Sequence, residues 1–226
     1  MSKLLRPGLT LFLLLLAIGH PSFLVAARRA NSAFPKPAVD SPIAPSHGHE
    51  EAVLSGGCFW GVQAVFEHTH GVLSAISGYT GGSADTAHYE MVEAGNTGHA
   101  ESVRITFDPS QITYGEILMI FFAVAHDPTQ LGKQGPDWGT QYRSALFYSS
   151  PEQKRIAEAY IAQLNAAKIY PQKIVTQVVA LQQFFPAESY HQDYARRHPD
   201  NPYIVINDLP KLAAFRNQFP DLYRDQ

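Results

Sequence analysis

The sequence predicts a single domain that combines strands and helices, preceded by an N-terminal extension. From Glu51 onward, strand-like runs alternate with segments whose apolar residues recur at helical spacing, and no internal repeat is present. The chain has 226 residues, a formal net charge of −3 and 45 % hydrophobic residues, which fits one ordinary globular domain with some added sequence. Because the charge shows no basic excess, we expect no nucleic-acid partner.

The N-terminal extension has the pattern of a secretory leader. Lys3 and Arg6 precede an apolar run at residues 9–18, and small residues follow at 25–27 before an arginine. We therefore expect residues 1–27 to be a signal peptide that exports the protein to a periplasmic or extracellular location.

An uncleaved membrane anchor is the alternative for the leader, since residues 7–27 carry no charge, although the apolar core is short for a span of roughly 20 residues. Residues 28–50 are rich in Pro, Ala and Ser and predict a flexible linker, so that the folded domain occupies residues 51–226. His47 and His49 lie on this segment and could hold a metal ion only weakly, so we expect no metal site.

The elements of the first half follow from local patterns. Residues 51–54 form a short apolar run that predicts a strand, and the helical spacing of apolar residues at 62–66 predicts a helix after it. Residues 72–77 predict a second strand, and the glycines at 78–83 a flexible loop. Residues 100–107 alternate most clearly, and this alternation places Glu101 on the face of Val103, Ile105 and Phe107.

The second half continues the alternation. Helical spacing predicts helices at residues 114–125 and 151–167, the second of which starts with a proline. Apolar runs predict strands at 145–148 and 174–180, and glycines and prolines predict a long loop at 127–139. A short helix is expected at residues 190–194.

Cys58 is the only cysteine in the sequence and lies between glycines and two aromatic residues, in Gly56-Gly57-Cys58-Phe59-Trp60-Gly61. The predicted strand-to-helix junction places it at a helix N-terminus, where unpaired N–H groups lower a thiol pKa from its ordinary value near ~8.5. A buried structural cysteine is the alternative. Without a second cysteine, Cys58 would be an unpaired thiol in an oxidising compartment, which favours a reactive role.

Other side chains could converge on this thiol. On the apolar face of its strand, Glu101 would be desolvated, which raises a carboxyl pKa and makes it a proton donor near neutral pH. Alternatively, it is a strand-end glutamate that reaches solvent. Tyr79, Tyr89 and Tyr142 flank the two glycine-rich loops and could donate hydrogen bonds, and Phe59-Trp60 could line a hydrophobic cup, unless they only pack.

Several motifs resemble those of the A-type peptide methionine sulfoxide reductases, over residues 51–206. They are Gly57-Cys58-Phe59-Trp60-Gly61, Gly98-His99-Ala100-Glu101-Ser102-Val103, Gly135-Pro136-Asp137, Gly139-Thr140-Gln141-Tyr142-Arg143-Ser144 and Ala187-Glu188-Ser189-Tyr190-His191-Gln192-Asp193-Tyr194. The resemblance implies an α+β fold, a two-layer sandwich with a ferredoxin-like core and a mixed or antiparallel sheet with flanking helices. It also implies reduction of the S-epimer of methionine sulfoxide, free or in oxidised proteins.

By the same resemblance, Cys58 is the nucleophile and Glu101 the acid that hydrogen-bonds the sulfoxide oxygen, assisted by Tyr89 and Tyr142. Phe59 and Trp60 correspond to the pocket for the substrate methyl group, and Asp137 to the residue that positions the substrate. The chain departs from the family pattern at Trp138, where a smaller or polar residue is expected, and in having no recycling cysteine near the C-terminus.

With no resolving cysteine in this sequence, a Cys58 sulfenic acid would need an external thiol. We expect no bound cofactor, a monomer, and a small thiol or a thioredoxin- or glutaredoxin-like protein as the reductant. Two other functions stay open: a cysteine hydrolase or acyl-transferase with His99, His126 or His191 as its base, and a secreted binding module with an inert cysteine.

Overall fold

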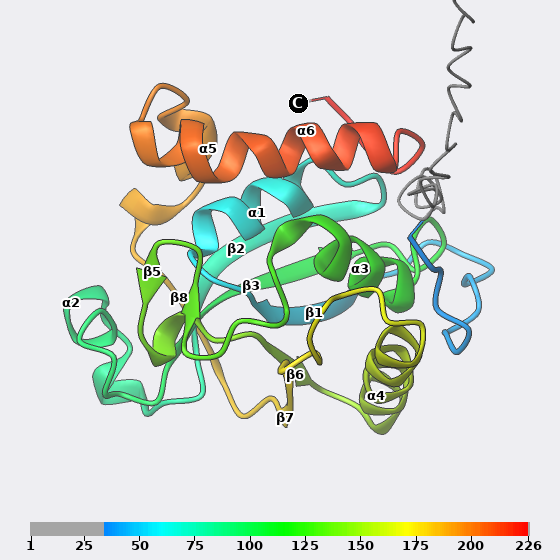
Figure 1. Ribbon diagram of the computed structural model, residues 1–226, viewed down its shortest axis with the longest axis horizontal. Coiled ribbons are helices and arrows are strands. Elements are labelled where there is room, and N and C mark those ends of the chain that lie inside the picture. The colour runs from blue at the N-terminus through cyan, green and yellow to red at the C-terminus, as the bar shows by residue number, and fades with distance from the viewer. Residues whose placement is uncertain (1–33, 226) are drawn as a thin grey trace, which may run out of the picture. The chain divides into compact units, whose positions relative to one another are not determined.

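The computed structural model describes residues 34–225, and a six-stranded mixed sheet lies at their centre (Figure 1). Its strands are β1 (Glu50–Ser55), β2 (Val72–Thr80), β3 (Ala100–Phe107), β6 (Ala145–Tyr148), β7 (Gln177–Ala180) and β8 (Phe184–Pro186), in the order β7-β6-β1-β3-β2-β8. Neighbouring strands are antiparallel except β6 and β7, which are parallel. A separate hairpin pairs β4 (Lys133–Gln134) with β5 (Asp137–Trp138).

Residues 34–225 also form six α-helices: α1 (Phe59–Glu67), α2 (Tyr89–Val92), α3 (Tyr114–Ile120), α4 (Pro151–Ala166), α5 (Tyr194–Arg197) and α6 (Leu209–Gln218). Two π-helical turns, η2 (Phe121–Ala125) and η5 (Ile204–Asp208), continue α3 and precede α6. Short 3₁₀ turns are η1 (Ala84–Thr86), η3 (Thr140–Tyr142) and η4 (Ser189–His191). Figure 1 shows α1 and α6 side by side over the sheet, and the two helices are in contact.

The main core lies between one face of the sheet and the helices. Leu54, Val103 and Ile105 belong to the same buried cluster as apolar residues of α1, α3, α4 and α6. The opposite face carries a smaller cluster around Val53 and Phe147. The two clusters are separate because alternate residues of each strand point to opposite faces of the sheet. With the helices packed on the face that carries the main core, the predicted two-layer α+β fold is confirmed.

Several element boundaries differ from their prediction. β2 runs through Thr80 into the predicted loop at 78–83, because its last residues pair with β3 and β8. The strand predicted at 174–180 begins only at Gln177, where pairing with β6 begins, and β8 was not predicted. The helix predicted at 190–194 is divided between η4 and α5, since Asp193 adopts a left-handed conformation (φ 54°).

The predicted flexible linker at residues 28–50 is wrong over its described part. Tyr160 donates a hydrogen bond to the carbonyl of Pro35 (2.6 Å), and the Asp40 carboxylate accepts from the Gly115 N–H (2.8 Å) and the Thr113 hydroxyl (2.6 Å). β1 begins at Glu50. Side-chain contacts of this kind leave no periodic pattern in the sequence.

The predicted leader at residues 1–27 lies outside the described residues. Within residues 34–225, the helices are too short or too polar to cross a bilayer. In the same part of the chain, no three His, Cys, Asp or Glu side chains cluster as metal ligands would, and His47 pairs with Asp108.

Candidate active site

Cys58 lies at the N-terminal end of α1, directly after the turn that leaves β1, as predicted. Gly57 has a φ of +89°, a conformation that L side chains rarely adopt, and a Cβ there would lie 2.5 Å from Gln134 Cγ. The glycine therefore permits both the turn and the close approach of the 127–139 loop. Cys58 itself is 9 % exposed, so the thiol is held in a largely closed site.

Gly61 has a different role in the same motif. A Cβ at this position would clash with the Asp208 carboxylate and lie 2.6 Å from Lys211 Nζ. Asp208 and Lys211 form an ion pair (2.9 Å), and their approach to the first turn of α1 needs a residue without a side chain. This glycine thus brings the α6 segment close to the cysteine.

Glu101 lies on β3 with its side chain on the core face, and it is 3 % exposed. The pairing of β1 with β3 brings it to the start of α1, where its Oε2 accepts a hydrogen bond from the Phe59 N–H (3.0 Å). Burial raises the pKa of Glu101 to about 8, although the Phe59 N–H opposes this rise. The carboxyl group is consequently neutral in most molecules at pH 7, as an acid catalyst requires.

The predicted lowering of the Cys58 pKa is wrong for the free site. Burial raises the thiol pKa well above its ordinary value, and the charges of Glu101 and Asp208 raise it further. The N–H of Trp60 at the helix N-terminus and the charge of Lys211 oppose this rise but are outweighed. Desolvation of an anion can cost several kcal/mol, whereas a helix terminus contributes about 0.3–1 kcal/mol at an exposed site. The Cys58 thiol and the Glu101 carboxyl are therefore both protonated in the free site near pH 7.

One pocket contains all seven side chains that the sequence singled out for catalysis and substrate binding. It is lined by Cys58, Phe59, Trp60, Tyr89, Glu101, Asp137, Tyr142 and Tyr203. Tyr89 comes from α2 and Tyr142 from η3, so segments far apart in the chain converge on the cysteine. Burial raises the pKa of Tyr89 to about 12 and also raises that of Tyr142. Both phenols therefore keep their protons and can act as hydrogen-bond donors.

Tyr203 was not predicted as a site residue. Its hydroxyl donates a hydrogen bond to the Asp137 carboxylate (2.5 Å), and this contact joins the 127–139 loop to η5. The local sequence Asn201-Pro202-Tyr203 carries no distinguishing signal, and the chain has eleven tyrosines. Only the tertiary contact identifies it.

The aromatic wall of the pocket, Phe59 and Trp60, is supported by aromatic and histidine side chains on its other side. Trp60 stacks on Tyr194 at 3.7 Å between ring centroids, and its indole N–H donates to His191 Nδ1 (3.3 Å). The Tyr79 ring packs against Phe59, but its hydroxyl donates to Glu188 (2.8 Å) and the residue does not line the pocket. Trp138 is also outside it: the side chain is 73 % exposed and lies under Lys133 Nζ (4.7 Å).

The three histidines considered as bases are engaged elsewhere. His99 bonds to the Ser83 carbonyl, and His126 contacts the Ser144 hydroxyl and has its pKa lowered to about 3 by burial. His191 accepts from Trp60. In the hydrogen-bond network of residues 34–225, no histidine is bonded to the Cys58 thiol, so the arrangement of a cysteine hydrolase is not found.

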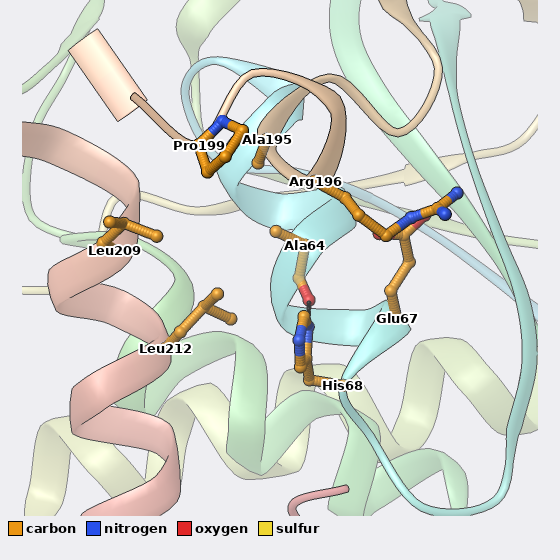
Figure 2. Close-up of a pocket in the computed structure, with 8 residues that line it drawn as sticks. All are labelled: Ala64, Glu67, His68, Ala195, Arg196, Pro199, Leu209 and Leu212. Atoms are coloured by element: carbon orange, nitrogen blue, oxygen red, sulfur yellow. Dashed lines mark hydrogen bonds between the residues drawn. The ribbon is translucent and has the colours of Figure 1, made fainter. Parts of the chain in front are cut away.

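A larger apolar groove lies between α1, α5 and α6 (Figure 2). Its lining residues are Ala64, Glu67, His68, Ala195, Arg196, Pro199, Leu209 and Leu212. It shares no residue with the pocket at Cys58, and the His68 ring in it is bonded to the Ala64 carbonyl (2.8 Å). The groove therefore lies outside the chemical site.

The fold brings a cysteine and a neutral carboxylic acid into one pocket, an arrangement suited to a thiol-dependent enzyme. The family model for peptide methionine sulfoxide reductase matches residues 50–223, and the chain belongs to this family. It is therefore an oxidoreductase, a peptide methionine sulfoxide reductase of the A type.

Individual relatives support this assignment. "Peptide methionine sulfoxide reductase MsrA 2" of Mesorhizobium japonicum is 56 % identical over 83 % of this chain and 95 % of its own length. The protein of the same name from Synechocystis is 48 % identical over 93 % and 99 %. Among solved structures, methionine sulfoxide reductase A of Corynebacterium diphtheriae has a TM-score of 0.60 and 33 % identity, covering 78 % of this chain and 91 % of that one. Reduced Mxr1 of Saccharomyces cerevisiae has a TM-score of 0.63 and 30 % identity, covering 71 % and 91 %.

Proposed function

We propose that the enzyme reduces the S-epimer of methionine sulfoxide, free or in oxidised proteins, through a sulfenic acid at Cys58. The observation that carries this proposal is the neutral Glu101 carboxyl in the same pocket as the thiol. A sulfoxide oxygen is a poor leaving group until it is protonated, and Glu101 is the acid placed to protonate it. Phe59 and Trp60 provide the apolar wall for the methyl group on sulfur.

The reaction transfers the oxygen atom from the sulfoxide sulfur to the Cys58 sulfur. The Cys58 sulfur attacks the sulfoxide sulfur while Glu101 gives its proton to the oxygen and recovers one from the thiol. This attack forms a sulfur–sulfur bond; the sulfur–oxygen bond of the substrate then breaks, the oxygen bonds to the Cys58 sulfur, and the sulfur–sulfur bond breaks, so methionine leaves reduced and the cysteine is left as a sulfenic acid. Tyr89 and Tyr142 donate hydrogen bonds to the oxygen as negative charge develops on it. Asp137, oriented by Tyr203, positions the substrate.

The return to the thiol uses an external reductant. Residues 1–226 contain one cysteine, so a small thiol, a thioredoxin or a glutaredoxin reduces the sulfenic acid in the proposed cycle. The leader pattern at residues 1–27 supports an exported enzyme, with an uncleaved anchor as the alternative. Its role would be the repair of oxidised proteins outside the cytoplasm.

A single-turnover experiment tests this mechanism. The reduced protein, mixed with excess methionine sulfoxide and no reductant, should release about one methionine per chain. Mass spectrometry should then find Cys58 as a sulfenic acid or its trapped adduct. An unmodified thiol after methionine release would refute the proposed chemistry.

A further inference from the structure

Cys58 lines two pockets, and the proposed cycle assigns a role only to the one that binds the sulfoxide. The second pocket is lined by Cys58, Gln134, Gly135, Pro136, Asp137, Tyr203, Asn207 and Lys211. It shares Cys58, Asp137 and Tyr203 with the sulfoxide pocket, and none of its other residues lines that pocket. The hydrogen bond from Tyr203 to Asp137 thus joins two residues that line both pockets, and each pocket offers an opening toward Cys58.

The two openings differ in chemistry. The sulfoxide pocket contains the proton donors Glu101, Tyr89 and Tyr142 together with the aromatic wall. The second opening has no aromatic wall apart from the shared Tyr203, and its cationic residue is Lys211, whose side chain is 19 % exposed. Lys211 also lies near enough to Cys58 to lower the pKa of the thiol. Lys211 is paired with Asp208 (2.9 Å), whose charge acts on the thiol more strongly than that of Lys211, so the opening offers access to the sulfur and Lys211 only moderates the negative charge around it.

In a displacement at sulfur, the attacking and the leaving group occupy opposite sides of the sulfur atom, so the two openings would serve different reactants. A thiolate that attacks a sulfenic acid forms a sulfur–sulfur bond while the sulfur–oxygen bond breaks, and the entering and leaving groups lie in line. The hydroxyl group on Cys58 forms on the side of Glu101, which delivers the proton to the oxygen. The incoming thiolate must therefore approach from another side, and the second opening provides that approach.

We propose that the opening lined by Gln134, Asn207 and Lys211 is the entry site for the external thiol that reduces Cys58, separate from the sulfoxide pocket. This inference rests on the proposed sulfenic-acid cycle. The thiolate forms a mixed disulfide with Cys58, and the hydroxide departs as water with a proton from Glu101. A second thiolate then attacks the reductant's sulfur, which releases Cys58 as a thiolate and an external disulfide.

The test separates the two half-reactions. The protein is oxidised with methionine sulfoxide, desalted, and mixed with dithiothreitol, and loss of the trappable sulfenic acid is followed by mass spectrometry. Asn207→Trp fills the second opening from η5. It should slow this reduction at least tenfold and leave the rate of methionine formation within twofold of the wild type.

Two further variants control for size and charge. Ile206→Trp adds the same bulk on the same turn at a side chain that is 70 % exposed, and it should change neither half-reaction. Asn207→Asp keeps the volume but adds a negative charge near Lys211, and it should slow reduction by dithiothreitol threefold or more, with the effect smaller at high salt.

A normal reduction rate in Asn207→Trp would show that the thiol enters through the sulfoxide pocket and would overturn the inference. Equal slowing of both half-reactions would also overturn it, because the two openings would then not be independent. A wild-type protein that forms methionine without a sulfenic acid would instead refute the proposed cycle.

Discussion

Glu101→Gln is the most informative single substitution, since it keeps the side-chain shape and removes the proton that the mechanism transfers. With a pKa of about 8, roughly 90 % of the Glu101 carboxyl groups are neutral at pH 7. With its ordinary pKa of 4.5, fewer than about 1 % would be neutral. Burial on β3 therefore keeps the Glu101 carboxyl protonated at neutral pH. Replacing it with glutamine should abolish its contribution to the rate as a proton donor.

The expected loss follows from general acid catalysis, which is typically worth about 10²–10⁴ in rate, or about 3–5 kcal/mol of barrier. Single-turnover rates of methionine formation should fall by this factor in Glu101→Gln. In the wild type, the rate should decline as pH rises through about 8, because the raised pKa keeps the acid protonated below that pH and ionised above it. This decline should be missing in the variant.

The assay is rapid quench with chromatographic detection of methionine between pH 6 and 9.5. Glu90→Gln is the matched control, because Glu90 is exposed on α2 beside Tyr89 and does not line the pocket. It should keep the wild-type rate and pH profile. A Glu101→Gln rate within threefold of the wild type would assign the proton to a phenol or to water and refute the role of Glu101.

Three other substitutions or substrates give independent tests. Cys58→Ser should abolish methionine formation while thermal unfolding stays within a few degrees of the wild type, and measurable turnover with any thiol would contradict the role of the cysteine. A racemic mixture of methionine sulfoxide should lose its S-epimer and keep its R-epimer on chiral chromatography, whereas equal consumption would contradict the proposed specificity. Asp40→Ala removes the bonds to Thr113 and Gly115 and should lower the free energy of unfolding by about 1–2 kcal/mol in urea titrations. An unchanged midpoint would show that the bonds of Asp40 do not stabilise the domain.

The environment of Glu101 also makes stability depend on pH. Its pKa is raised in the folded state, so the folded protein binds the proton more tightly than the unfolded chain does. This contribution is complete below pH 4.5 and is lost as pH rises through about 8. Glu101→Gln should remove it, which would flatten the dependence of the unfolding midpoint on pH in that range.

Local patterns in the sequence determined much of the fold and of the site. The junction between β1 and α1 placed Cys58 at a helix start, and alternation along β3 placed Glu101 on the buried face. These features were predictable because backbone conformation and side-chain direction follow from neighbouring residues. Motif resemblance added Asp137 and selected Tyr89 and Tyr142 from the tyrosines beside the glycine-rich loops.

Only the tertiary structure decided how these parts act on one another. The pairing of β1 with β3 brought Glu101 to α1, and the bond from Tyr203 to Asp137 joined the 127–139 loop to η5 beside the thiol. The same folding overturned the predicted lowering of the Cys58 pKa. A helix N-terminus is recognisable in the local sequence. Burial and the charges of Glu101 and Asp208 depend on segments that are distant in the chain, and desolvation by those segments outweighs the local effect.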